Sequence, residues 1–358
     1  MFTKEMKDIR TASHSSRAVK KQDQQVARRH LLLGGISLPS AAALLATCSK
    51  DMAKESGKDK EHIKISFVGA VLNNPFWDQV KRGALAAADS LAGVELIYVA
   101  PDDFSLANIN EIIKTVIASS PDGIAIDYRG QEFERVTQQA LDQGMEVQFF
   151  NNFKGLDSED PRIVRLAESA VGLDKYEAAR RSGEAFLEFL NPNDPIVLFN
   201  GLPDTYEHLL IQNAYLRFFS EVGWERKHVQ TFPVGLDSAQ NFQLMKSYLA
   251  AHSEVRGIIC WDSLVGSPAA RAKVDSGLDI PILSWNLDPI IIQSIKDGSL
   301  TLTLSQQPYV QAYYTVVALY LKLKYRLIQP PSVDPGVFLI SRSNLLEAEK
   351  LFLKGILG

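Results

Sequence analysis

The sequence has too little of several residues and motifs to belong to some common classes of protein. Its two cysteines, Cys48 and Cys260, are too few for a disulfide framework, and a bond between them is the less favoured interpretation. No G-x-G-x-x-G follows the first strand of either half of the chain, which disfavours a dinucleotide site. No pair of the six histidines has the spacing of metal ligands, so surface or capping roles are expected for His208, His228 and His252.

Acidic residues outnumber basic ones after the first 47 residues. The chain has 38 Lys and Arg against 42 Asp and Glu, a net charge of −4. Residues 1–47 carry +5, which leaves −9 on residues 48–358. Such a body has no bulk attraction for nucleic acid or acidic membranes. The 358 residues, 46% hydrophobic, suit a soluble globular protein of two domains after the N-terminal segment is set aside.

Residues 1–47 contain the parts of an export signal. Arg28-Arg29 precedes an alanine-rich apolar segment that Pro39 interrupts, and this segment is too short and broken for a comfortable transmembrane helix. The paired arginines resemble a twin-arginine signal. Ala27 and Leu31 depart from its usual residues, so the Sec route stays open.

The end of this segment resembles a bacterial lipoprotein cleavage box, Leu45-Ala46-Thr47-Cys48. Thr47 stands where Gly, Ala or Ser is usual. Lipidation of Cys48 is therefore favoured over plain cleavage, a retained anchor or an ordinary cysteine. Residues 48–62 are polar without an apolar period, as expected of a disordered tether. We expect the folded body to begin near Ile63, in the periplasm or at the cell surface.

From residue 63 the apolar pattern alternates between strand and helix through two halves. This alternation predicts an α/β fold of two doubly wound, parallel-sheet lobes. The expected strands are 63–70, 94–99, 123–127, 146–150, 196–200, 229–233, 257–261, 280–285 and 300–305. The expected helices are 78–91, 107–118, 133–143, 176–190, 207–222, 239–252, 268–276, 289–296 and 310–324, and segment 330–340 is expected to be a return crossing.

Seven strand-like runs end in an amide, an acid or an aromatic residue. Ligands of open α/β sheets bind beyond the carboxyl ends of the strands, so these side chains should converge on one cleft of hydrogen-bonding groups and flat rings. Such a cleft suits a sugar. The residues after the runs are Asn73-Asn74-Pro75-Phe76-Trp77, Asp127-Tyr128-Arg129, Asn151-Asn152, Asn200, Trp261-Asp262, Trp285-Asn286 and Gln306-Gln307.

The stretch Asn73-Asn74-Pro75-Phe76-Trp77, directly after a first strand and before a helix with Gly83-Ala84, resembles the start of periplasmic sugar-binding proteins of the ribose/galactose type. The similarity covers nearly all of residues 63–345, and the ordered set is more specific than any one piece. The further pieces are Asp122-Gly123-Ile124, Leu173-Asp174, Gly201, Asp262, Ile280-Pro281-Ile282, Trp285-Asn286, Asp297-Gly298 and Gln306-Gln307-Pro308.

This resemblance implies a type I periplasmic binding protein, the solute-binding component of an ABC transporter. Two lobes joined by a three-crossing hinge would close on a ligand and hand it to the permease. The crossings would lie near residues 150–152, 307–308 and 335–336. The first lobe would be residues 63–151 plus 308–335, and the second 152–307 plus 336–358.

The resemblance also implies which residues bind the ligand. Phe76 and Trp77 match a ring pair that packs on the apolar face of a sugar, and Asn74 matches an amide that contacts its hydroxyl groups. Polar contacts are implied at strand ends. The residues at those positions are Asp127, Asn151, Asp262, Gln306 and Asn286, the last where many members have Asp.

The chain departs from the family where members often place an arginine, early in the helix after the fifth strand. That stretch reads Tyr206-Glu207-His208 here. Arg129 is a candidate to supply the guanidinium. Trp261 replaces a usual Asn, and with Tyr206 and Trp285 it is a candidate to enlarge the aromatic lining. No calcium loop of the kind found in some galactose-type members is evident, so no metal or other cofactor is expected.

Structural roles compete with these assignments. Phe76 and Trp77 also suit core packing at a helix start, and the amides suit caps and turns. Asp262 suits the N-cap of the helix expected near Pro268. Arg129 suits a solvated loop.

The favoured function is an exported protein that binds a monosaccharide or similar polyol by hinge closure, without catalysis. Its expected partners are the sugar and an ABC transporter permease. It is expected to be a monomer, to bind no nucleic acid and to reach a membrane only through a lipid anchor. The alternatives are a sensor subunit for a chemoreceptor or histidine kinase, an enzyme on a similar fold, and a repressor module, which an export leader disfavours.

Overall fold

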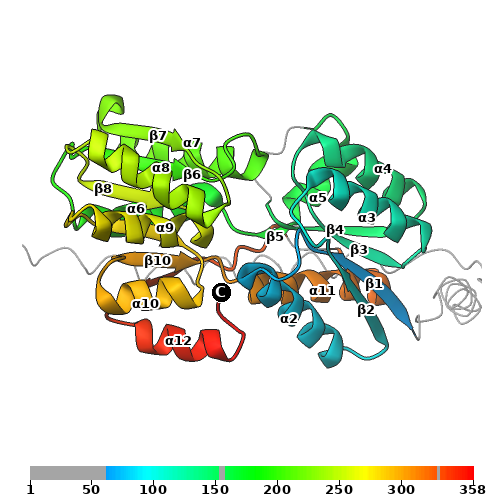
Figure 1. The fold of residues 1–358 in the computed structure, drawn as a ribbon. Coiled ribbons are helices and arrows are strands. Elements are labelled where there is room, and N and C mark those ends of the chain that lie inside the picture. Colours follow the sequence, from blue (N-terminus) through cyan, green and yellow to red (C-terminus); the bar gives the residue numbers. More distant parts are fainter. Residues whose placement is uncertain (1–61, 153–157, 329–330) are drawn as a thin grey trace, which may run out of the picture. The chain divides into compact units, whose positions relative to one another are not determined.

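The computed structural model describes residues 62–152, 158–328 and 331–358, which form two α/β lobes, each with its own sheet (Figure 1). The first sheet has the order β2-β1-β3-β4-β5 and the second β11-β10-β9-β8-β6-β7. Neighbouring strands run parallel except for β10 and β11. The two-lobed α/β prediction is therefore confirmed. The predicted export signal, Cys48 and the tether up to residue 61 lie outside the described residues.

Helices cover both faces of the first sheet. Its strands are β1 (Ile63–Val68), β2 (Val94–Val99), β3 (Gly123–Asp127), β4 (Glu146–Asn151) and β5 (Val171–Gly172). One face carries α2 (Pro75–Ser90) and α11 (Pro308–Tyr325), and the other α3 (Leu106–Ala118), η2 (Gln131–Phe133), α4 (Glu134–Asp142) and α5 (Pro161–Glu168). A glycine allows the close packing of α2 on α11, because a Cβ on Gly83 would lie 2.1 Å from the carbonyl oxygen of Tyr309.

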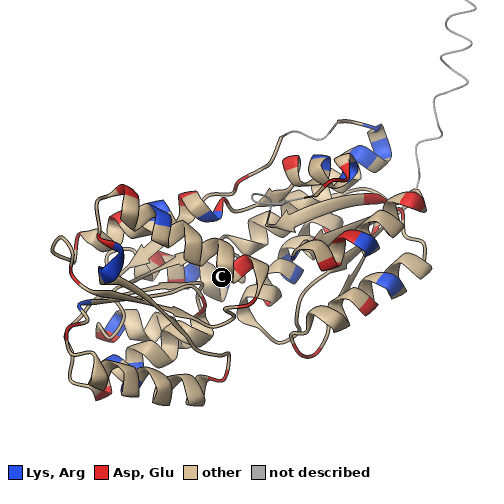
Figure 2. Cartoon of the chain, turned by 90° about the horizontal axis from the view of Figure 1, so that it is seen from above, with Lys and Arg blue, Asp and Glu red and all other residues tan. Residues whose placement is uncertain are grey.

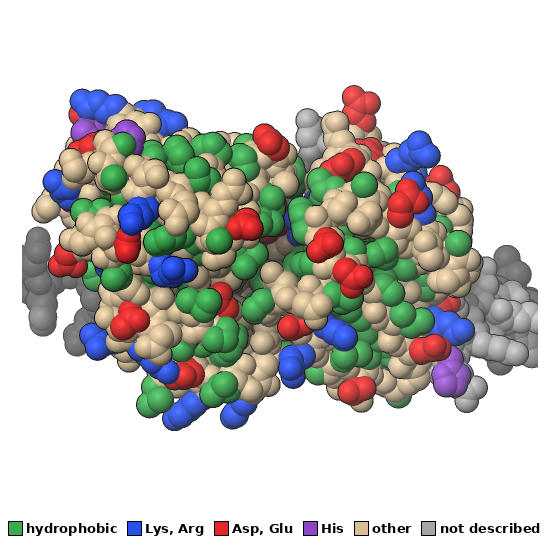
Figure 3. All heavy atoms as spheres, viewed as in Figure 1, with side chains coloured by type: hydrophobic (Ala, Val, Ile, Leu, Met, Phe, Trp, Pro, Cys, Tyr) green, Lys and Arg blue, Asp and Glu red, His purple; other side chains and the backbone are tan. Residues whose placement is uncertain are grey.

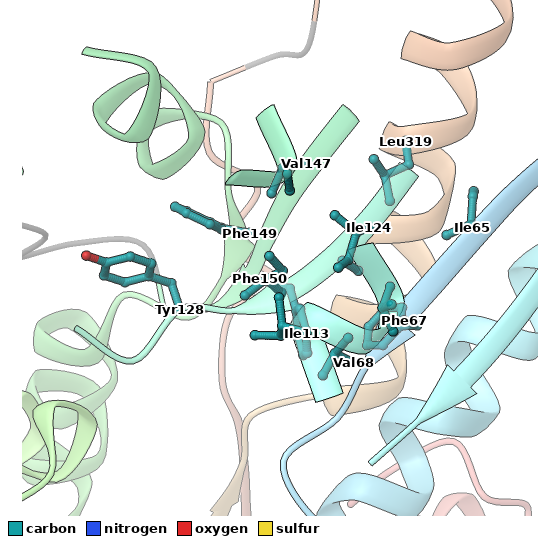
Figure 4. Close-up of a cluster of buried hydrophobic side chains, with 14 of the residues drawn as sticks. Ile65, Phe67, Val68, Ile113, Ile124, Tyr128, Val147, Phe149, Phe150 and Leu319 are labelled. Atoms are coloured by element: carbon teal, nitrogen blue, oxygen red, sulfur yellow. The ribbon is translucent and has the colours of Figure 1, made fainter. Parts of the chain in front are cut away.

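The core of this lobe lies between the sheet and its two helix layers (Figure 4). All five residues of β3 are buried. Coverage on both faces explains why this strand is a continuous apolar run rather than an alternating one. The carboxyl ends of β1, β3 and β4 face the second lobe. Side chains at and after these ends line a cavity together with residues of that lobe.

The second lobe is built in the same way. Its strands are β6 (Ile196–Asn200), β7 (Val229–Pro233), β8 (Gly257–Cys260), β9 (Ile282–Trp285), β10 (Leu302–Ser305) and β11 (Phe338–Ser341). Its helices are α6 (Lys175–Leu187), α7 (Tyr206–Glu221), η3 (Arg226–His228), α8 (Ser238–Ala251), α9 (Ser263–Asp275), α10 (Pro289–Asp297) and α12 (Leu345–Leu353). Trp285 is fully buried and its Nε1 donates to the Tyr215 hydroxyl at 2.7 Å, so it belongs to the core and does not enlarge the lining of the site.

The first lobe extends further along the chain than expected. β5 pairs with β4, and Val333 bridges to Val171, so residues up to Gly172 belong to the first sheet. The boundary expected between residues 151 and 152 is therefore too early, and the chain crosses between Gly172 and α6. A two-residue strand and a two-turn helix have too few apolar positions to show a period in the sequence.

The chain crosses between lobes at two further points, after β10 and before β11. Gln307 lies between β10 and α11 in the left-handed region, with φ of 54°. Its Nε2 donates to the carbonyl oxygens of Pro335, at 2.5 Å, and Gly336, at 3.3 Å. The Asp174 backbone N–H donates to Asp334 Oδ2 at 3.3 Å. These bonds connect all three crossings, so a hinge motion at one is coupled to the others.

Helix α9 is longer than the sequence predicts. It begins at Ser263, and Pro268, expected near its start, lies inside it. Proline lacks the N–H that would bond the carbonyl four residues earlier. That carbonyl belongs to Leu264 and accepts a hydrogen bond from Asn241 Nδ2 at 3.4 Å. The Asn241 side chain, which belongs to α8, thus replaces the hydrogen bond that Pro268 cannot donate. No helix among the described residues is both long and apolar enough to cross a membrane.

Candidate functional site

A cavity of about 280 Å³ lies between the two lobes at the carboxyl ends of the strands. Figure 3 shows one outer face of the two lobes, with the boundary between them. The first lobe contributes Val71, Leu72, Asn73, Asn74, Pro75, Phe76, Trp77, Phe104, Arg129 and Asn151, and the rest of the lining is Leu202, Glu207, His208, Ile211, Leu236, Trp261, Asp262, Ser263, Leu264, Asn286 and Gln306. All the residues predicted to bind the ligand, except Asp127, therefore lie around one cavity. Of the other residues expected at the cleft, the lining does not include Tyr128, Asn152, Asn200, Trp285 and Gln307.

Aromatic rings form the wall of the cavity in the first lobe. Trp77 is only 6% exposed and its ring centroid lies 5.3 Å from that of Phe76 and 6.1 Å from that of Phe150. Arg129 Cζ lies 5.8 Å from the Trp77 ring centroid and 5.2 Å from that of Phe104. Trp77 thus belongs to the core and lines the cavity as well. Core packing and ligand contact were considered as alternatives for it, but the geometry allows both.

Two predicted ligand-binding residues cap helices that begin at the cavity. Asn74 Oδ1 accepts from the backbone N–H groups of Phe76, at 3.0 Å, and Trp77, at 3.3 Å. Asp262 Oδ1 accepts from Leu264 N at 2.7 Å, so Asp262 is the N-cap of α9. Both side chains also line the cavity. Capping holds each in one orientation, with Asn74 Nδ2 and Asp262 Oδ2 outside the capping bonds.

A buried network of ion pairs crosses between the lobes at the cavity. Arg129 pairs with Asp127 at 2.5 Å within the first lobe and with Glu207 of the second lobe at 3.2 Å. Lys175 pairs with Glu207 at 3.2 Å. The solvated-loop alternative for Arg129 is wrong, since its side chain is 7% exposed. Asp127 lies behind Arg129 and outside the lining, where it can orient the guanidinium.

Amides extend this network along the cavity. Lys175 Nζ donates to Gln306 Oε1 at 2.7 Å and to Asn151 Oδ1 at 3.3 Å, and Gln306 Nε2 donates to Asn286 Oδ1 at 3.0 Å. Asn151 and Asn286 have φ of 68° and 66°. Asparagine tolerates this left-handed conformation better than most residues, which helps explain amides at these strand ends. The amides hold one another and Lys175 in place.

The carboxylates of the site differ in their ease of ionisation. Burial raises the pKa of Asp262 to about 6, and the charges of Glu207 and Asp288 add to the rise. Burial likewise raises the pKa of Asp127 to about 6, against the opposing effect of Arg129. Burial also opposes ionisation of Glu207, but Lys175 and Arg129 overcome it and hold that pKa at about 2. Glu207 is thus a permanent anion, while Asp262 titrates near neutrality.

His208 is a site residue that the sequence did not identify. It is 6% exposed and lines the cavity, so the expected surface or capping role is wrong for it. Burial lowers its pKa to about 4, against the effect of the Glu207 carboxylate. His208 Nδ1 lies 3.0 Å from Trp261 Nε1, which donates, and 3.1 Å from Asn200 Oδ1, so the ring is held between α7, β6 and the end of β8.

Glu207 and Lys175 were also missed as site residues. The one signal for Glu207 was that the stretch Tyr206-Glu207-His208 lacks the arginine that the resemblance implies early in this helix. Lys175 stands in the first turn of α6, where a lysine is indistinguishable in sequence from a surface residue. Tyr206, proposed to enlarge the lining, is outside it.

Comparisons with known proteins show which proteins this chain resembles in sequence. A family model for a periplasmic binding protein domain matches residues 65–326. The xylose/arabinose-binding protein XylF of Sulfolobus acidocaldarius is 24% identical over 299 residues, 79% of this chain and 72% of that protein. The ribose import binding protein RbsB of Escherichia coli K12 is 22% identical over 300 residues, 76% of this chain and 86% of that protein.

Solved structures have the same fold. A glucose-galactose binding protein, GanP, of Geobacillus stearothermophilus superposes with a TM-score of 0.70 at 21% identity, over 80% of this chain and 99% of that one. A carbohydrate transporter of Acidothermus cellulolyticus in complex with myo-inositol superposes with a TM-score of 0.70 at 22% identity, over 82% of this chain and 99% of that one.

Proposed function

Because the chain belongs to the periplasmic binding protein family, we propose that it captures a monosaccharide or similar polyol between its lobes and delivers it, unchanged, to an ABC importer. The resemblance seen in the sequence is confirmed at the level of the family. The relatives named for xylose, arabinose and ribose support a sugar as the ligand. No observation favours the alternative of a sensor subunit.

The observation that carries this proposal is the cavity between the lobes. Its volume of about 280 Å³ lies just below the roughly 300–1,000 Å³ of pockets for drug-sized ligands, as suits one small ring. Trp77 and Phe76 offer flat surfaces to the C–H face of a sugar, and Asp262 and Asn286 offer hydrogen-bonding atoms to its hydroxyl groups. Arg129, Lys175, Asp127 and Glu207 already neutralise one another, so the site suits an uncharged ligand.

The export route, the lipid on Cys48 and the monomeric state complete the proposal. A lipid-anchored monomer would hold the cavity outside the cytoplasmic membrane, where solute is captured before import. A Cys48→Ala variant tests the anchor, because it should appear in the soluble fraction of cells while the native chain stays with the membrane.

A thermal-shift screen tests the ligand class. Pentoses, hexoses, deoxy-sugars and polyols should include a compound that raises the unfolding temperature with increasing concentration, because a ligand at 100 times its Kd stabilises the folded state by about 2.7 kcal/mol. Sugar acids and amino sugars are the charged controls and should have smaller effects. Recovery of the compound unchanged after incubation supports binding without catalysis, and a product would contradict it. A screen in which only charged compounds stabilise the protein would contradict an uncharged ligand.

Affinity for the ligand should fall as the pH drops through about 6. The Asp262 carboxylate is the form that accepts hydrogen bonds from hydroxyl groups, and its raised pKa of about 6 means that protonation begins near neutrality. Titrations followed by tryptophan fluorescence at pH 5, 6, 7 and 8 measure this effect. An Asp262→Asn variant is the control, because Asn does not titrate and its weaker binding should vary less with pH. Equal pH profiles for the two proteins would shift the effect to another group, such as Asp127.

A further inference from the structure

The end of α11 lies at the outer edge of the first lobe, next to the point where the described chain begins. Leu323 contacts the start of β3, since a Cβ on Gly123 would lie 3.0 Å from its Cδ1. Lys322 Nζ pairs with Glu146, the first residue of β4, at 2.6 Å. Asp122 N donates to Lys64 O in β1 at 2.9 Å, so the starts of these strands form one edge. In Figure 1 the start of β1 and the end of α11 share this end of the lobe.

Apolar side chains are exposed along this end of α11. Leu321 is 36% exposed, Tyr325 50%, Leu327 51% and Ile328 96%. Leu321 and Tyr325 lie four residues apart on one face of α11, and Leu327 and Ile328 lie just beyond its C-cap, Arg326. An isoleucine that is almost fully exposed beside a half-exposed tyrosine and leucine contributes nothing to the core and has an unfavourable contact with water.

Basic side chains surround these apolar residues. Lys322, Lys324 and Arg326 alternate with them in sequence, and Glu146 is the carboxylate that pairs with Lys322 and lies 4.0 Å from Arg326. These cations outnumber the carboxylate that pairs with them, so this part of the surface is basic on a body whose net charge is −9. Figure 2 shows acidic and basic residues interspersed elsewhere over both lobes. Aliphatic, tyrosine and basic residues together are the composition of surfaces that lie in a membrane interface.

We propose that Leu321, Tyr325, Leu327 and Ile328, with Lys322, Lys324 and Arg326, form a membrane-contact patch through which the first lobe lies against an anionic bilayer. The proposal rests on the lipid anchor of the proposed function. Only 13 residues separate Cys48 from His62, and a chain of that length spans at most about 45 Å when fully extended. A lipid on Cys48 would thus keep this edge close to the bilayer, at a high effective concentration.

Charge favours a bilayer over a second copy of this chain. The rest of the body is acidic and is repelled by an anionic surface, whereas this patch is attracted to it. Two copies meeting through the patch would bring two basic surfaces together. The patch therefore orients the body as well as holding it, with the same lobe edge always toward the lipid.

A fluorescent label at the patch tests the proposal. The chain is purified from membranes with its lipid, carries Ile328→Cys labelled with the polarity-sensitive dye NBD, and is placed on vesicles of phosphatidylglycerol and phosphatidylcholine. We expect a blue shift and roughly a twofold rise in emission as the label enters the interface. The rise should be smaller on phosphatidylcholine alone and at 1 M salt, where the Debye length is about 3 Å. Cys260 is fully buried and will not compete for the dye.

Matched variants make the result decisive. Leu353→Cys, at a residue of α12 that is 77% exposed, should show no change on vesicles. Lys324→Glu with Arg326→Glu should abolish the rise at residue 328, while the thermal shift with sugar persists, so that loss of the patch is distinguished from loss of the proposed function. If the chain lacks a lipid and does not sediment with the vesicles, the same contrasts are read in a Cys48→Ala background, so that only the introduced cysteine is labelled, and at a higher lipid concentration. An unchanged signal at residue 328, equal signals at residues 328 and 353, or a rise without vesicles that grows with protein concentration would each overturn the proposal.

Discussion

Replacing Arg129 by methionine should lower the free energy of unfolding by about 3–5 kcal/mol, the cost of breaking a buried ion pair from one side. The variant leaves Asp127 buried with hydrogen bonds only from Asn151 and Asn152, at 3.3 and 3.1 Å, and leaves Glu207 with Lys175 as its one cation. Methionine retains much of the packing against Trp77 and Phe104. Denaturation by urea, followed by tryptophan fluorescence, measures the loss.

The pH dependence of this loss identifies its cause. The pKa of Asp127 is already raised to about 6 in the folded protein, and removal of Arg129 removes an effect that lowers it. A folded-state pKa above the unfolded value means that stability is lost as the pH rises through it. The variant should therefore be less destabilised at pH 5 than at pH 8. A double variant, Arg129→Met with Asp127→Asn, should recover part of the loss at pH 8.

Arg162 provides the matched control. It also pairs with two carboxylates, Asp142 at 2.6 Å and Asp160 at 2.9 Å, but its side chain is 39% exposed. Exposed pairs of this kind contribute little to stability, because solvent screens the charges. If Arg162→Met and Arg129→Met cost the same, burial of the Arg129 network would not explain its contribution to stability.

The sequence predicts the central strands of this fold well because they are buried on both faces. β3 and β6 have the predicted bounds, and each is a fully buried run of mainly apolar residues. The edge strands β2 and β7 also have the predicted bounds, although they are only partly buried. Elements with few apolar positions were missed. α5 and β5 are too short for a visible period, and α9 begins earlier than predicted because a side chain of α8 compensates for the proline inside it. Packing partners distant in sequence decide such cases.

The site residues likewise fall into two groups, those that the sequence could predict and those that it could not. Residues at or just after the carboxyl ends of strands, such as Asn151, Asp262 and Gln306, could be placed at the cavity because these ends share one edge of a sheet. Lys175 and His208 could not, since each lies in the first turn of a helix, where no sequence pattern shows whether a side chain points to solvent or to the cavity. Their roles arise only when the two lobes meet.

Replacing Trp77 by alanine should weaken ligand binding at least about 30-fold, the roughly 2 kcal/mol typical of a buried aromatic residue that dominates an interface. The burial of Trp77 and its contacts with Phe76 and Phe150 show that the variant should also lose about 3–5 kcal/mol of stability, as large-to-small core substitutions do. Affinity is measured by isothermal titration calorimetry at a temperature where the variant is folded.

Trp224 separates the two effects. It is 8% exposed, close to the 6% of Trp77, and packs in the second lobe, where its Nε1 donates to Asp194 O at 3.0 Å, away from the cavity lining. Trp224→Ala should therefore lose comparable stability and keep its affinity. Trp77→Phe retains a ring at the cavity, so it should recover most of the ligand affinity and most of the stability that Trp77→Ala loses. Equal affinities for Trp77→Ala and Trp224→Ala would reduce Trp77 to a core residue, and the flat face of the sugar would then have to pack against Phe76 or Phe104.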